Sequence, residues 1–136
     1  MSKQVFVSLP VTDVARSTAF YEAIGFTKNA AFSNEQASAL QWSDTFSVMV
    51  ASHDFYATLT PKQIVDPRTS SQALFALAMD SREAVDAISA AAVAAGGREA
   101  HGAEDEGFLY SRGFEDPDGH GWGPMFMDMS AASEAA

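Results

Sequence analysis

Apolar and polar residues alternate over the first part of the chain, in the pattern of a half-buried strand. Every second side chain is apolar in residues 4–9, which predicts a strand there. Pro10 is expected to end it, because proline donates no hydrogen bond to a ladder. Apolar residues then recur at helical spacing, so a helix is expected that Thr12 or Asp13 caps and Gly25 ends.

The remaining pattern predicts that this order of elements continues and then repeats. Three strands follow the first helix, and after an irregular stretch come a strand, a helix and three more strands. The second helix is expected to begin at an Asp80–Glu83 capping box and to end at Gly96-Gly97. The expected strands cover residues 26–32, 37–42, 45–52, 73–79, 98–101, 108–114 and 121–127. The chain is therefore predicted to form an α+β fold of two paired βαβββ modules.

One domain is expected, since domains cluster near ~100–150 residues. Residues 53–71 have no clear period and contain two prolines, which is typical of a connection between two halves. The predicted organisation is a single domain of residues 1–129 followed by a flexible tail, 130–136. Within it, module one covers about 4–53, the crossover 54–71 and module two about 72–128.

Composition narrows the chemistry that the chain can support. It has 136 residues, no cysteine and three histidines, so disulfides and thiolate metal sites are excluded. The net charge of −10 disfavours binding to nucleic acid and to anionic membrane surfaces. Neither a signal peptide nor a long apolar run is visible, so a cytoplasmic protein is expected.

Two motifs resemble those of a known family. Leu9-Pro-Val-Thr-Asp13 leads into a helix that carries Phe20-Tyr-Glu22, and Phe114-Glu-Asp-Pro-Asp-Gly-His120 forms a turn before the last strand. In this order, and across nearly the whole chain, they resemble the vicinal oxygen chelate superfamily. That superfamily includes glyoxalase I, bleomycin-resistance and fosfomycin-resistance proteins and extradiol dioxygenases. The resemblance implies paired βαβββ modules and a homodimer.

Members of this superfamily that use a metal hold a divalent ion with His, Gln or Glu at four strand positions. The resemblance places those positions at Phe6, near Met49, near Leu74 and at Gly123. None of these residues offers a ligand that a hard divalent cation accepts, because a thioether prefers soft metals and the others have no donor. We therefore expect no metal and no other cofactor.

Tyr110 and Arg112 share one face of a predicted strand, but alternation does not say which face. They could hold an anionic or aromatic ligand, or they could point outward. With His120 they are the candidates for catalytic groups. The predicted ligand-binding residues are Phe6, Ser8, Met49, Leu74, Tyr110, Arg112, Trp122 and Gly123.

Three functions follow from these expectations. The first is a metal-independent protein that binds a small molecule between its two modules, with its reaction unknown. The second is a metal-dependent lyase or dioxygenase of glyoxalase I or extradiol type, with ligands relocated to His120, Glu106 or Asp118. The third is a non-catalytic dimeric interaction module.

Overall fold

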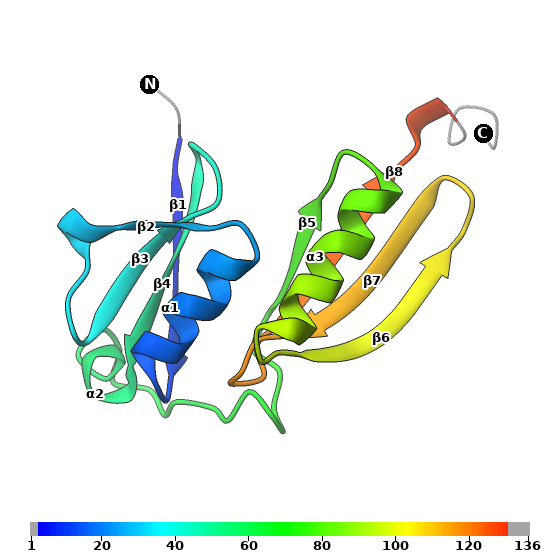
Figure 1. The fold of residues 1–136 in the computed structure, drawn as a ribbon. Helices are drawn as coiled ribbons and strands as arrows, with labels where there is room; N and C mark the ends of the chain where they lie inside the picture. The colour runs from blue at the N-terminus through cyan, green and yellow to red at the C-terminus, as the bar shows by residue number, and fades with distance from the viewer. Residues whose placement is uncertain (1–2, 131–136) are drawn as a thin grey trace. The chain divides into compact units, whose positions relative to one another are not determined.

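The computed structural model describes residues 3–130, so the predicted tail lies almost entirely outside the described residues. The chain divides into two compact units, the first ending at Asp66 and the second beginning at Pro67. The division falls inside the stretch expected to connect the two modules. Each unit has its own sheet and helix (Figure 1).

The first unit contains a four-stranded sheet in the order β1-β4-β3-β2, in which β1 runs parallel to β4 and the other pairs are antiparallel. Two short helical segments, η1 and α2, follow β2 and β4. The bounds are β1 Val5–Val11, α1 Val14–Ala23, β2 Thr27–Asn29, η1 Ala30–Phe32, β3 Ala37–Gln41, β4 Phe46–Ser52 and α2 His53–Tyr56.

The second unit repeats this topology in the strand order β5-β8-β7-β6, again with one parallel pair, β5 and β8. Its elements are β5 Leu74–Ala78, α3 Arg82–Ala94, β6 Arg98–Asp105, β7 Leu109–Glu115 and β8 Gly121–Met127. The predicted α+β fold of two βαβββ modules is confirmed. Within residues 3–130, no helix combines the length and the hydropathy of a membrane span.

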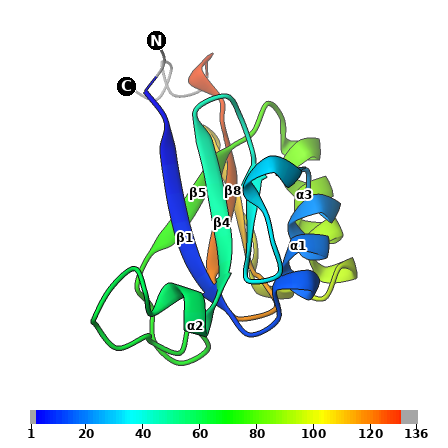
Figure 2. The ribbon, with the colours of Figure 1, turned by 90° about the vertical axis from the view of Figure 1, so that its left-hand side faces the viewer.

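Helix α1 covers only one face of the first sheet, and Figure 2 shows it running along one side of the strands. The Thr18 hydroxyl on α1 donates to the Ser38 hydroxyl on β3 at 2.9 Å, which marks the covered face. Leu40 and its cross-strand partner Val48 are fully buried on that face. Since successive strand residues point to opposite faces, Met49 and its neighbours on that side lie on the uncovered face.

Helix α3 covers one face of the second sheet in the same way. Its buried stripe includes Val85 and Ile88. On the sheet, Trp122 pairs with Phe75 on one side and Phe114 on the other, and the rings of Trp122 and Phe75 lie 4.8 Å apart. Trp122 and Phe114 are buried. The predicted ligand-binding residue Trp122 therefore belongs to the core under α3.

The expected end of the first strand at Pro10 is wrong, because β1 continues to Val11. The N–H of Val5 donates to Thr45 in the direction of β4. In a parallel pair the alternate residues, Phe6, Ser8 and Pro10, direct their backbone groups to the outer edge. Proline is tolerated there because β1 is an edge strand and loses no hydrogen bond to β4.

Three other boundaries differ from the sequence prediction. The strand expected over 26–32 stops at Asn29, whose side chain accepts from the N–H of Ala31 and begins the 3₁₀ segment η1. The second helix is capped by Ser81, which accepts from Ala84, so the Asp80–Glu83 capping box is wrong. Strand β6 runs to Asp105, through residues expected in a loop.

The turn between β7 and β8 is held by one carboxylate. Asp116 Oδ1 accepts from the backbone N–H groups of Asp118, Gly119 and His120 at 3.0, 2.9 and 2.9 Å. Gly119 has φ +108°, and a Cβ there would come within 2.9 Å of the backbone carbonyl carbon of Pro67. The start of the second unit is thus packed directly against this turn.

Gly119→Ala is expected to destabilise the protein more than Gly96→Ala. Both glycines have positive φ, which costs a residue with a side chain about 1–3 kcal/mol. Only Gly119 would also place its Cβ against backbone, whereas Gly96 has open space. Urea unfolding of the two variants measures the difference, and equal losses would show that the contact with Pro67 is not close.

Candidate functional site

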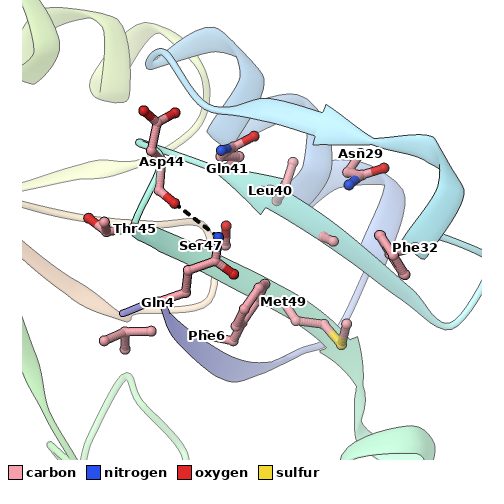
Figure 3. A pocket seen from close by; sticks show the side chains of 12 residues that line it. Gln4, Phe6, Asn29, Phe32, Leu40, Gln41, Asp44, Thr45, Ser47 and Met49 are labelled. Atoms are coloured by element: carbon pink, nitrogen blue, oxygen red, sulfur yellow. Dashed lines mark hydrogen bonds between the residues drawn. The ribbon is translucent and has the colours of Figure 1, made fainter. Parts of the chain in front are cut away.

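The uncovered face of the first sheet carries a pocket of about 360 Å³ (Figure 3). Small-molecule sites typically have volumes of about 300–1,000 Å³. The pocket spans residues from all four strands, from η1 and from the turn between β3 and β4. Its lining residues are Gln4, Val5, Phe6, Asn29, Phe32, Ala39, Leu40, Gln41, Asp44, Thr45, Ser47 and Met49.

Strand register explains why these residues meet. Phe6 of β1 lies opposite Ser47 of β4, and Met49 of β4 lies opposite Ala39 of β3. Ala39 in turn lies opposite Asn29 of β2. Residues in register across a sheet point to the same face, so two adjacent rows of side chains on one face supply most of the lining.

The lining combines an apolar floor with polar groups at its margin. Phe6, Phe32 and Met49 supply an aromatic and thioether surface (Figure 3). The side chains of Phe6 and Phe32 are 64% and 70% exposed, which is unusual for residues of this size unless a surface is built to be covered. The arrangement can therefore accept a molecule with an apolar body.

Side-chain amides at the pocket are anchored to backbone. Gln4 Nε2 donates to the Asp44 carbonyl at 3.3 Å, which ties the start of β1 to the β3–β4 turn (Figure 3). Gln41 Nε2 donates to the Ser43 carbonyl at 3.0 Å. One N–H of each amide is engaged with a main-chain oxygen, so each side chain still has one N–H donor and its carbonyl oxygen as an acceptor.

The predicted ligand-binding residues fall into separate groups. Phe6 and Met49 line the pocket, and Ser8 pairs with Met49 on the same face without lining it. Leu74 and Gly123 lie in the second unit, on the face of its sheet opposite α3. The side chain of Leu74 is 80% exposed.

Tyr110 and Arg112 lie on the face of β7 that α3 covers, which answers the question that alternation leaves open. The Tyr110 hydroxyl donates to Asp86 Oδ1 at 2.6 Å, and Arg112 Nη1 donates to the same oxygen at 3.1 Å. Arg112 Nη2 also donates to Glu99 at 3.2 Å. The Tyr110 hydroxyl and both terminal nitrogens of Arg112 thus link β7 to α3 and β6, while Arg112 Nε is buried without a hydrogen-bond partner.

This cluster shifts the ionisation of its members. The hydrogen bond from the Tyr110 hydroxyl, followed by the one from Arg112, lowers the pKa of Asp86. The same hydrogen bond to Asp86 raises the pKa of Tyr110, because the proton is held by a carboxylate. The hydrogen bond to Asp86 raises the pKa of Arg112, so its charge is retained. All three pKa shifts favour a charged Asp86, a protonated Tyr110 and a charged Arg112, which is the arrangement of a structural contact.

The remaining candidate catalytic residue, His120, closes the turn before β8. Its backbone N–H donates to the Asp116 carboxylate and its carbonyl accepts from the Asp116 N–H. His101 lies over Gly113, where a Cβ would come within 2.6 Å of its Nε2. His53 is the first residue of α2.

The side chains present do not fit the metal site that the superfamily implies. The four expected positions hold Phe6, Met49, Leu74 and Gly123, which offer at most one thioether. Among residues 3–130, no group of three or more His, Asp or Glu side chains is placed to hold a metal ion. The relocated set of His120, Glu106 and Asp118 does not form such a group either.

Most of the residues that line the pocket could not be predicted from the sequence. Ser47 and Ala39 could be found from Met49, the first by period-two alternation along its strand and the second by cross-strand pairing. Asn29 and Phe32 could not, because residues 26–32 read as one strand and η1 has no clear sequence signal.

Solved structures of the same fold support this topology. A hypothetical protein from S. aureus superposes with a TM-score of 0.78 at 21% identity, covering 93% of this chain and 94% of that one. A glyoxalase/bleomycin resistance protein/dioxygenase family enzyme from Burkholderia phytofirmans PsJN has a TM-score of 0.79 at 18% identity, covering 93% and 99%. A bleomycin-binding protein in complex with bleomycin has a TM-score of 0.62 at 22% identity, covering 92% and 98%.

The paired βαβββ modules define the class of protein, and a sequence comparison defines the family. The model of the Glyoxalase/Bleomycin resistance protein/Dioxygenase superfamily matches residues 3–123. The chain belongs to this superfamily, which confirms the resemblance drawn from its motifs. No curated protein sequence matches the chain significantly.

Tyr110→Phe is expected to raise the pKa of the Asp86 carboxyl toward its ordinary value near ~3.9. A carboxyl whose pKa is lowered by folding stabilises the protein above its unfolded pKa, and this contribution disappears as the pH falls through the folded pKa. The variant should therefore be less stable than the parent at pH 7, with the difference shrinking in acid. NMR titration of Asp86 and urea unfolding measure both effects.

Tyr56→Phe is the matched control, because it removes the hydroxyl oxygen of a tyrosine in the first unit. It should leave the Asp86 titration unchanged. An unaltered Asp86 pKa in Tyr110→Phe would show that this hydrogen bond does not form in solution.

Proposed function

We propose that this member of the superfamily is a metal-independent small-molecule binding protein that uses the pocket on the first sheet. The observation that carries the proposal is the exposed aromatic and thioether surface of Phe6, Phe32 and Met49, framed by polar side chains. A few polar groups around an apolar concavity are the usual composition of a ligand site.

Metal independence is supported by the donors at hand. The four positions that bind the ion in metal-using relatives hold residues that a hard divalent cation does not accept. In the part of the chain that the structure describes, no alternative cluster replaces them. The cytoplasmic location and the homodimer expected from the sequence belong to the same proposal.

Binding of a small molecule is known for a protein of this fold. One protein of the same fold is a bleomycin-binding protein that was solved with bleomycin. At 22% identity this likeness is one of fold, so it supports a ligand-binding role and does not indicate the drug as the ligand of this chain.

Ser47→Trp should abolish binding of an apolar probe. Ser47 lies on the central strand β4 and lines the pocket, so an indole there occupies the space of the ligand. The probe is N-phenylnaphthylamine, followed by its fluorescence and by thermal stabilisation. A ligand at a hundredfold excess over Kd stabilises the folded state by about 2.7 kcal/mol.

The control is Ala15→Trp, which adds the same indole on the exposed side of α1. It should bind the probe as the parent does. If Ser47→Trp stays folded and still binds the probe with parental affinity, the pocket is not the binding site.

The purified protein is expected to carry Ni, Zn, Fe and Mn each at well below one ion per chain, because the chain offers no suitable set of donors. Elemental analysis after dialysis measures this, and titration with each ion should leave the unfolding temperature unchanged. A tightly held stoichiometric ion would contradict the proposal and favour a metal-dependent lyase or dioxygenase.

A further inference from the structure

We infer that the pocket on the first sheet selects uncharged aromatic molecules and rejects anions of the same shape. This inference rests on the proposed function and names the class of ligand. It replaces the anionic ligand suggested by Arg112 and Tyr110 in the sequence, since both side chains are engaged with α3 and β6.

No positively charged side chain is among the twelve that line the pocket. Lys28, on the neighbouring strand β2, pairs with Leu40 and so lies on the face that α1 covers. Arg16 lies on α1 and donates to the Thr12 hydroxyl at 3.0 Å. An anion entering the pocket would lose water without meeting an opposite charge, which is strongly unfavourable.

A negative charge stands at the margin of the pocket instead. Asp44 lies in the turn between β3 and β4, and its exposed carboxylate points away from Phe6 and Met49 (Figure 3). The chain as a whole carries a net charge of −10, which adds a repulsive field for any anion. The charge of Asp44 and the net charge of the chain therefore both disfavour the binding of an anion.

The polar groups beside the floor are neutral amides. Gln4 and Gln41 each donate one N–H to the carbonyls of Asp44 and Ser43, which leaves each amide with its second N–H and its carbonyl oxygen. The Asn29 oxygen accepts from the N–H of Ala31, and its amide nitrogen carries two N–H donors. A neutral ligand can therefore form hydrogen bonds with these amides, and none of them offers a full positive charge.

The floor of the pocket favours an aromatic ligand. Phe6 and Met49 lie on adjacent strands, and Figure 3 shows their side chains next to each other at the base of the pocket. Phenyl rings and thioethers both make favourable contacts with aromatic rings. A flat ring system would cover this floor and reach the amides.

Two related probes test the charge preference. N-phenylnaphthylamine is uncharged and has one N–H, and anilinonaphthalene sulfonate is the same skeleton with a sulfonate added. Fluorescence titration should give a Kd at least about tenfold lower for the uncharged probe, as expected when one nearby like charge acts at low effective dielectric. Asp44→Lys should narrow or reverse this ratio, and Asp44→Asn should narrow it less.

Glu22→Lys is the matched control, because it makes the same change in net charge on the exposed side of α1. It should leave the ratio near the parental value. Equal affinities for the two probes in the parent, or a ratio that Glu22→Lys changes as much as Asp44→Lys does, would overturn the inference while the proposed function stands. Failure of both probes to bind the folded parent would overturn the proposed function itself.

Discussion

One constraint governs the rest of this structure: in each unit, a single helix covers a single face of a four-stranded sheet. Side chains alternate between faces, so every strand residue is committed either to the helix or to the opposite face. In the first unit, Leu40, Val48 and the residues on the same face of the sheet pack under the helix. The residues of the opposite face, which include Phe6 and Met49, are left to line a pocket.

The same division gives the polar residues opposite roles in the two units. In the second unit, Tyr110 and Arg112 lie on the helix face, where Asp86 accepts from the Tyr110 hydroxyl and the charge of Arg112 is matched by Asp86 and Glu99. In the first unit, Gln4 and Gln41 each donate one N–H to a backbone carbonyl, and the rest of each amide is left at the pocket. Polarity therefore serves packing in one sheet and is available for recognition in the other.

The fold could be predicted from the sequence because its signals are local: strand alternation, the Asp13 cap of the first helix and the Asp116–Gly119 turn. The orientation of Tyr110 and Arg112 could not, because it depends on which side α3 packs. Phe6 and Met49 followed from the family motifs, and both line the pocket. The turn into η1 at Asn29 depends on one side-chain hydrogen bond, and strand propensity does not report it.

Pro10 has a consequence for how the first sheet meets other strands. The outer edge of β1 presents the N–H groups of Phe6 and Ser8, but at Pro10 there is no N–H to present. A strand from another chain that aligned with this edge would therefore leave one carbonyl oxygen without a donor from β1, a cost that such a pairing must overcome. Pro10 thus makes the outer edge of β1 a poorer template for a further strand, while the pairing of β1 with β4 stays complete.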